Sequence, residues 1–147
     1  SLSSIEKKAL MELIYLPYRS KIEREIHEVQ DSVVHLSIHS FVPEWKGAVR
    51  PVEIGLLFDP ARREEAAFCD ELKYLLEKNL HNFRIVYNEP YKGIDDGLTT
   101  YLRTRFSDVK YRGIEIEINQ GLVGTSAWTE VKFALTESVD VLINQSN

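Results

Sequence analysis

The sequence predicts an α/β domain with a mostly parallel, mixed sheet flanked by helices. Two observations predict this class. Short apolar runs with the period of strands alternate with longer segments that have the period of helices. The chain has 147 residues, 44% hydrophobic and 28% charged, which is sufficient for one buried core. We therefore expect residues 1–147 to form a single domain.

The amino-terminal segment has the pattern of two helices. Ser3 and Glu6 have the spacing of a capping box, so the first helix is expected to begin there. Pro17 should break or kink this helix, because proline lacks the backbone N–H. A second helix is expected to follow, with Ile22 and Ile26 on one face.

Four segments have the pattern of strands. They are Val33–Ile38, Val52–Phe58, Phe83–Tyr87 and Gly113–Ile118. No helix separates the first two, so the second is expected to pair antiparallel or to lie at an edge. Residues 42–51 between them are expected to form a loop, since they contain two prolines and a glycine.

Three further helices are expected. Asp59 and Pro60 favour a helix start, and the apolar periodicity continues to about His81. The run 95–97, Asp-Asp-Gly, leads into a short helix. Ser126 can cap the last helix, whose inward residues are expected to be Trp128, Val131, Leu135 and Leu142.

Composition excludes several classes of function. The net charge of −5 and the scattered basic residues argue against a nucleic-acid partner. The one cysteine, Cys69, excludes an internal disulfide, and its apolar neighbours predict a buried, inert thiol. No segment has the length of a membrane span, and we expect a cytoplasmic protein.

Two histidines lie on one face of the first predicted strand. His35 and His39 are about 13 Å apart along a strand, so they cannot bind the same metal ion. His39 lies at the carboxyl end, where ligands bind in open α/β sheets. His35 lies inside the strand and is expected to be a hydrogen-bonded structural histidine.

The last predicted strand carries Glu115, Glu117 and Asn119 opposite three isoleucines. Carboxylates inside a covered sheet are costly unless they are paired or near a cation. An edge strand with one wet face is the alternative interpretation.

Further polar residues follow the third strand and precede the second. Asn88 and Tyr91 belong to a turn, and Arg50 could bind a carboxylate with its planar guanidinium group. If the strands are parallel, His39, Asn88 and Glu117 converge on one edge of the sheet. An imidazole and a carboxylate there suggest metal-assisted hydrolysis, in which histidine holds the metal and glutamate takes a proton from water.

Three blocks of the sequence resemble the N-formylglutamate amidohydrolase family, in the same order and at similar spacing. They are LSIHSFVPEWKGAVRPVEIGLLFDP, NEPYKGIDDGLTTYLR and YRGIEIEINQ, and the segment YLPYRSKI before them is also similar. The resemblance implies a zinc-carboxypeptidase-like three-layer α/β sandwich. It also implies zinc-dependent cleavage of an N-acyl amide of an amino acid, such as release of formate from N-formylglutamate.

The resemblance also implies roles for individual residues. His39 matches the zinc-ligating histidine, and Glu117 matches the general acid/base, with Glu115 as the second candidate. The residues expected to hold the carboxylate and orient the amide of a small N-acyl amino acid are Arg50, Asn88, Tyr91 and Ser40.

The chain departs from the family pattern in its length, because it resembles only the carboxyl-terminal portion of the family domain. Members have an additional amino-terminal part with further metal ligands, and a catalytic zinc site needs about three protein ligands. We therefore expect either that another segment or a second copy completes the site, or that the chain is a non-catalytic amino-acid-binding or interaction module. A third interpretation is an unrelated α/β protein in which Glu115 and Glu117 line a wet sheet face. A sheet edge left uncovered would favour association.

Overall fold

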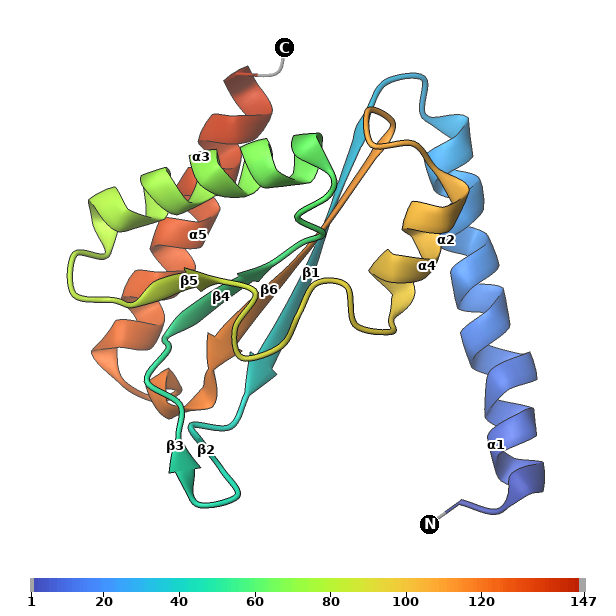
Figure 1. Ribbon diagram of the computed structural model, residues 1–147, viewed down its shortest axis with the longest axis horizontal. Coiled ribbons are helices and arrows are strands. Elements are labelled where there is room, and N and C mark those ends of the chain that lie inside the picture. The colour runs from blue at the N-terminus through green and yellow to red at the C-terminus, as the bar shows by residue number, and fades with distance from the viewer. Residues whose placement is uncertain (1, 146–147) are drawn as a thin grey trace.

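The computed structural model describes residues 2–145 and shows a central sheet between layers of helices (Figure 1). Four strands form this sheet in the order β1, β6, β4, β5, with bounds Val33–Phe41, Tyr111–Asn119, Ile54–Leu57 and Ile85–Tyr87. Two of the three strand pairs, β1–β6 and β4–β5, are parallel, and β4–β6 is antiparallel. The expected mostly parallel, mixed α/β sheet is confirmed, as is the antiparallel pairing of the second predicted strand. The alternative that this strand or β6 lies at an edge is wrong.

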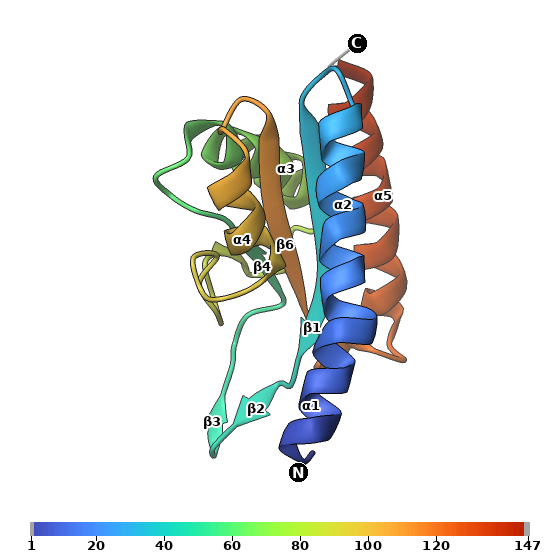
Figure 2. The ribbon, with the colours of Figure 1, turned by 90° about the vertical axis from the view of Figure 1, so that its right-hand side faces the viewer.

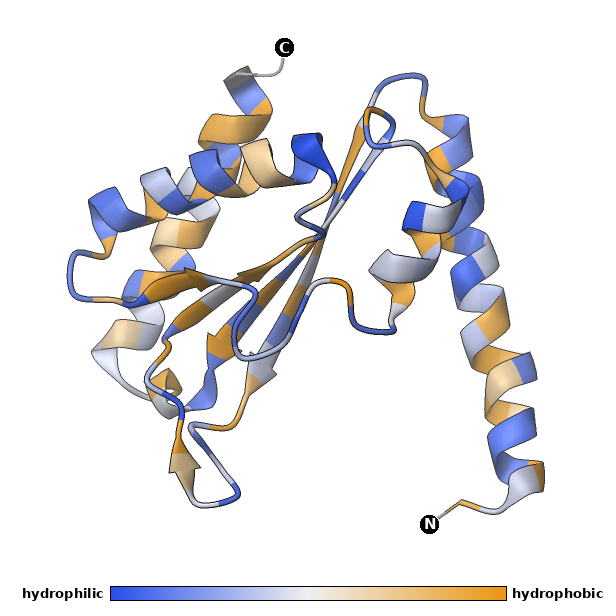
Figure 3. Cartoon of the chain, in the orientation of Figure 1, coloured by the Kyte–Doolittle hydropathy of each residue, from blue (hydrophilic) through white to orange (hydrophobic). Residues whose placement is uncertain are grey.

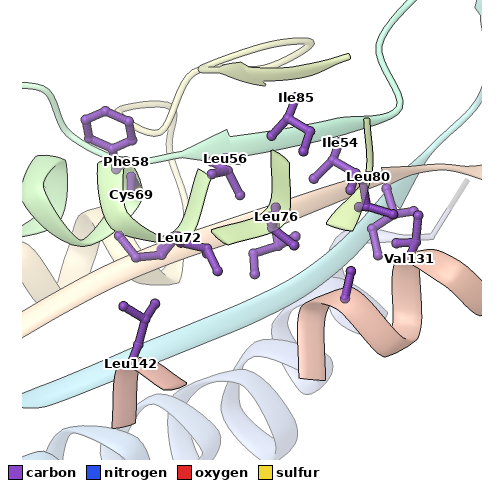
Figure 4. Packing of buried hydrophobic residues seen from close by; sticks show 14 residues of the cluster. Ile54, Leu56, Phe58, Cys69, Leu72, Leu76, Leu80, Ile85, Val131 and Leu142 are labelled. Atoms are coloured by element: carbon purple, nitrogen blue, oxygen red, sulfur yellow. The ribbon is translucent and has the colours of Figure 1, made fainter. Parts of the chain in front are cut away.

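One face of the sheet is apolar and is covered by α3 (Arg63–Asn79) and α5 (Ser126–Gln145). Alternate residues of the strands point to this side, so the isoleucines of β6 meet the apolar stripes of both helices. Figure 4 shows this core from close by, with Cys69 buried in it as expected. The inward residues of α5 are also confirmed: Val131 and Leu142 are buried, and Trp128 and Leu135 pack against the core.

The other face carries the polar side chains of β1 and β6, and helices cover only part of it. The helix α4 (Leu98–Arg105) packs with the end of α2 (Leu16–Glu28) around Tyr111, near the start of β6. In the view of Figure 2, α2 runs alongside the nearly vertical β1. The carboxyl-terminal half of this polar face is therefore left for a functional site.

The amino-terminal helix is continuous from Ser4 to Glu28. It consists of α1 (Ser4–Leu10), one π-helical segment η1 (Met11–Tyr15) and α2. The capping box of Ser3 and Glu6 is confirmed. The break expected at Pro17 is wrong, because the N–H of Leu16 bonds five residues back to Met11 and Pro17 then stands in the first turn of α2. A missing N–H has little cost at that position.

Two segments differ from the expected structure, each for a local reason. Residues 42–51 contain a small hairpin, β2 (Glu44–Trp45) with β3 (Ala48–Val49), and its turn residues Lys46 and Gly47 both have positive φ. This geometry is that of a two-residue hairpin turn. The helix α3 starts at Arg63, because the carboxylate of Asp59 accepts from the N–H of Ala61 and forms a separate turn before the helix.

No helix within residues 2–145 is sufficiently long and apolar to cross a membrane.

Candidate functional site

His39 and Glu117 lie side by side on the polar face of the sheet. The parallel register of β1 and β6 pairs His39 with Glu117 and, two residues earlier, Ser37 with Glu115. Partners in a parallel pair point to the same face, so four polar side chains form one patch. Because β6 lies between β1 and β4, both glutamates lie inside the sheet. The alternation of isoleucine and glutamate thus produces one core face and one polar face.

Glu117 is the most buried carboxylate of this patch, with 6% of its surface exposed. Its Oε2 atom is buried and has no hydrogen-bond partner within the described part of the chain. Burial raises the pKa of Glu117, an effect that nearby Glu115 reinforces and that the positive charges of His39 and Arg50 oppose. A buried carboxylate oxygen without a partner is costly, so this atom is available to an external group.

His39 is exposed on β1, and its Nε2 atom lies 2.9 Å from the hydroxyl oxygen of Ser37. An imidazole next to a carboxylate suits part of a zinc site. No group of three histidine, cysteine, aspartate or glutamate side chains suited to a metal ion occurs among residues 2–145. These residues therefore do not form a complete catalytic zinc site by themselves.

Arg50 lies at the end of the β2–β3 hairpin and faces three aromatic rings. Its guanidinium carbon is 5.3 Å from the ring centre of Tyr91, 5.6 Å from that of Trp45 and 5.8 Å from that of Phe41. Its Nη1 donates to the Tyr91 hydroxyl at 3.2 Å. The planar guanidinium group is thus oriented by cation–π contacts and one hydrogen bond, and it retains further N–H groups for a ligand.

Asn119 fixes the segment that carries Arg50. Its side-chain amide donates to the carbonyl oxygens of Arg50 at 3.3 Å and Val52 at 2.8 Å, and its Oδ1 accepts from the N–H of Gly121. All of these partners are backbone groups, so the role of Asn119 is to join the end of β6 to the hairpin.

The loop after β5 brings Tyr91 to Arg50, and not the convergence of parallel strand ends that was expected. The strands β4 and β5 run opposite to β1 and β6, so their carboxyl ends do not meet at the same edge, and the expected convergence of Asn88 with His39 and Glu117 is wrong. The loop after β5 instead crosses over Gly55, the register partner of Glu117. A Cβ atom at Gly55 would lie 2.0 Å from the carbonyl oxygen of Glu89. The absence of a side chain at Gly55 therefore allows the loop to reach the site.

Asn88 and Ser40 are placed differently from the other expected site residues. The Oδ1 atom of Asn88 accepts from the backbone N–H groups of Phe58 at 3.2 Å and Gly93 at 2.8 Å, so it shapes the loop. Ser40 follows His39 on the strand and therefore points to the opposite face, where it accepts from the side-chain amide of Gln120. The structure brings together His39, Glu115, Glu117, Arg50 and Tyr91.

A cavity of about 480 Å³ adjoins this patch. Its walls include Ser37, His39 and Glu115 from the sheet and Tyr91 from the loop. Tyr18, Asp96 and Thr99 also line it, and none of the three was expected to belong to the site. Thr99 donates to Glu115 and orients that carboxylate. The only sequence signals for these residues were the 95–97 turn before α4 and the segment YLPYRSKI.

His35 is separate from the site, as expected. Its Nδ1 atom lies 2.8 Å from the hydroxyl oxygen of Tyr111, next to the smaller core cluster. Burial lowers the pKa of His35, and Glu115 opposes this effect. The expectation of a hydrogen-bonded structural histidine is confirmed.

The family model of N-formylglutamate amidohydrolase matches residues 1–123, which include every residue of this site. The chain belongs to this family. Among solved structures, gene product Atu2144 from Agrobacterium tumefaciens is similar, with a TM-score of 0.67 and 25% sequence identity. The similarity covers 97% of this chain and 57% of that one, so the chain spans little more than half of its structural relative. A search of curated proteins found no match.

Proposed function

We propose that this N-formylglutamate amidohydrolase family member takes part in hydrolysis of an N-acyl amide of an amino acid, with N-formylglutamate as the reference substrate. Membership of the family supports this reaction class. The observation that carries the proposal is the buried carboxylate of Glu117, whose Oε2 has no partner among residues 2–145, beside the imidazole of His39.

Glu117 is the proposed proton carrier. In hydrolysis of the amide, the oxygen of water attacks the acyl carbon and the C–N bond breaks. Glu117 accepts a proton from the attacking water and passes one to the departing nitrogen, so that formate and a free amino acid result from an N-formyl substrate. Glu115, two residues earlier on the same face, is the second candidate, but Thr99 already occupies one of its oxygens.

Arg50 and Tyr91 are the proposed carboxylate-binding pair. A guanidinium group held among aromatic rings binds a carboxylate with little loss of its own freedom. The pair contacts a part of the substrate that keeps its charge during the reaction. It therefore contributes to substrate affinity and orientation, and Glu117 contributes to the chemical step.

His39 is the proposed contribution of this chain to a zinc site. Bound zinc supplies polarisation of an acyl carbonyl and lowers the pKa of a coordinated water. Since no group of three potential ligands occurs among residues 2–145, we propose that the remaining ligands come from a further segment or from a partner.

The first test combines metal content with turnover. The chain, together with the further segment or partner that completes the zinc site, is incubated with zinc, and formate release from N-formylglutamate and zinc stoichiometry are measured. We expect Glu117→Gln to lower kcat by about 10²- to 10⁴-fold, since it removes the proton carrier but keeps the shape. We expect His39→Ala to lose zinc.

The controls are Glu71→Gln on the exposed side of α3 and His81→Ala, another exposed histidine. Both should keep wild-type values. Full activity together with retained zinc in His39→Ala would contradict the proposal.

The second candidate function is a non-catalytic amino-acid-binding or interaction module. The incomplete ligand set of the described residues favours it. It predicts that glutamate or N-formylglutamate binds in the presence of a chelator, that Arg50→Ala abolishes this binding, and that no turnover accompanies it. Isothermal calorimetry with and without zinc distinguishes the two functions.

A further inference from the structure

Gly93 joins the loop that carries Tyr91 to the neighbouring elements. The N–H of Gly93 donates to Oδ1 of Asn88 at 2.8 Å. A Cβ atom at Gly93 would lie 2.2 Å from the backbone nitrogen of Phe58, so the loop backbone packs directly against the end of β4. The remaining backbone group, the carbonyl oxygen of Gly93, accepts from the Nη1 atom of Arg103 on α4.

Arg103 is buried and all three of its guanidinium nitrogens have partners. Its side chain is 6% exposed. Besides Gly93, it donates to the carbonyl oxygen of Gly113 on β6 at 2.7 Å, and its Nε lies 3.0 and 3.1 Å from the carboxylate oxygens of Glu65 on α3. The planar guanidinium group of Arg103 therefore connects α3, β6 and the loop that carries Tyr91. A lysine ammonium cannot make this set of contacts.

Glu65 on α3 holds Arg103 in this position. Its side chain has no exposed surface, and it accepts from the backbone N–H groups of Asp59 at 3.0 Å and Gly113 at 3.1 Å. It also pairs with Arg62 at 3.0 Å. A buried ion pair is stable only when its hydrogen-bonding groups are occupied in this way, so the position of Arg103 is strongly restricted.

We infer that Arg103 is a positioning residue, which acts through the carbonyl oxygen of Gly93 to hold Tyr91 against Arg50. The inference rests on the proposed function for what the Arg50–Tyr91 pair binds. Arg103 lies outside the patch and the cavity, so it contacts no substrate. Its loss is expected to weaken carboxylate binding and to leave the chemistry at Glu117 intact.

The test compares two lysine substitutions in the same ion network. Arg103→Lys keeps a positive charge for Glu65 but loses the forked contacts to Gly93 and Gly113. Arg62→Lys is the matched control, because Arg62 also pairs with Glu65 but donates to the carbonyl oxygens of Phe106 and Tyr111, away from the loop. Circular dichroism and thermal unfolding establish that both variants fold.

The first readout is independent of activity. Hydrogen exchange of the Gly93 amide is measured by nuclear magnetic resonance in the wild type and both variants. We expect exchange to accelerate by about tenfold or more in Arg103→Lys and to stay unchanged in Arg62→Lys, since only the former loses a charge-assisted bond to the loop.

The second readout separates binding from chemistry. For hydrolysis of N-formylglutamate in the presence of zinc, we expect Arg103→Lys to raise KM by about tenfold with kcat nearly unchanged, because a contact made equally in the ground and transition states affects KM alone. Arg62→Lys should keep the KM of the wild type.

A further variant, Asn88→Gly, removes a contact of Gly93 within the loop itself. Asn88→Gly removes the acceptor of the Gly93 N–H and tolerates the backbone φ of 52° at this position. It leaves the buried ion network intact, and we expect the same rise in KM. If Arg103→Lys fails to fold, an unchanged KM in Asn88→Gly would show that fixing Gly93 does not position Tyr91 and would overturn the inference.

The outcomes separate the two proposals. Equal exchange at Gly93 in the wild type and Arg103→Lys, or a fall in kcat at constant KM, would overturn the positioning role. Faster exchange in Arg103→Lys in a protein whose wild type shows neither turnover nor ligand binding would support the anchoring of the loop and overturn the proposed function.

Discussion

At the scale of single residues, hydrogen-bond partners distinguish the two buried carboxylates, Glu117 and Glu65. Glu117 is buried with an oxygen that has no partner among the described residues, and His39 beside it is exposed. Glu65 is even more buried, but its carboxylate oxygens accept from arginine side chains and backbone N–H groups. The carboxylate of Glu65 is thus saturated with partners, and that of Glu117, the proposed proton carrier, is not.

His35 should make stability depend on pH. Its folded-state pKa is lowered by burial, so the unfolded chain binds the proton more readily. The free energy of unfolding should be highest above the ordinary histidine pKa of about 6.5 and should fall as the pH drops through that value. Urea unfolding across this range is expected to show a smaller pH slope in His35→Gln than in the wild type.

The control for this comparison is His81→Gln, which changes an exposed histidine. Its slope should match that of the wild type. Equal slopes in the wild type and His35→Gln would disprove the effect.

Which face a residue lies on could be predicted from the sequence where a strand pattern determined it. The alternation along β1 and β6 placed His39 and Glu117 on one side, and the register confirms this, although both lie two residues before the end of their strands. Arg103 and Glu65 were not predicted, because their 3.0 Å contact joins two helices whose charged residues resemble ordinary surface positions. Residues that form ion pairs between distant segments show no local periodicity in the sequence.

At the scale of elements, the site depends on how loops and turns lie on the strands. The hairpin β2–β3 carries Arg50, and the loop after β5 carries Tyr91. Neither segment was expected to have this geometry. The turn residues of both were visible in the sequence, but the antiparallel β4–β6 pairing that decides their direction was expected only as one of two alternatives.

Gly55 is where β4 allows the loop to cross. We expect Gly55→Ala to reduce the free energy of unfolding by about 1–3 kcal/mol, because its methyl group would overlap the backbone oxygen of Glu89 and the loop would have to move. Substrate affinity should fall as well, since Tyr91 moves with the loop. Chemical denaturation and KM measure the two effects.

The matched control is Gly97→Ala. Its methyl group would meet only the carboxylate of Glu115 at 3.8 Å, and its φ of −175° suits any residue. Its stability should change by less than about 0.5 kcal/mol. An equal loss in both variants would show that the close approach at Gly55 is not the cause.

At the scale of the whole molecule, the amino-terminal helix is only partly covered. Ile5, Leu13 and Ile14 have 80%, 76% and 61% of their surface exposed. Figure 3 shows hydrophobic positions, in orange, along the part of the amino-terminal helix that extends away from the sheet. The outer edge of β1 also has no partner strand within the described part of the chain. An apolar surface of this kind favours association.

We expect the purified chain to form dimers or larger species as its concentration rises. Leu13→Lys should shift this equilibrium towards the monomer, because it places a charge in the apolar surface. Sedimentation velocity over a range of concentrations measures the shift. Ser20→Lys, at an exposed polar position of the same helix, is the control and should associate like the wild type. A wild-type chain that stays monomeric at every concentration would contradict the expectation.

The two strand pairs run in opposite directions, and this determines which parts of the sequence can vary without disturbing His39 and Glu117. His39 and Glu117 belong to the parallel pair β1–β6, whereas Arg50 and Tyr91 lie on connections that flank the other pair. Substitutions or insertions in those connections can alter what is recognised while the backbone under the imidazole and the carboxylate stays fixed. If Arg50 and Tyr91 bind the substrate as proposed, variation in substrate preference among relatives should therefore concentrate in the hairpin and the 88–97 segment.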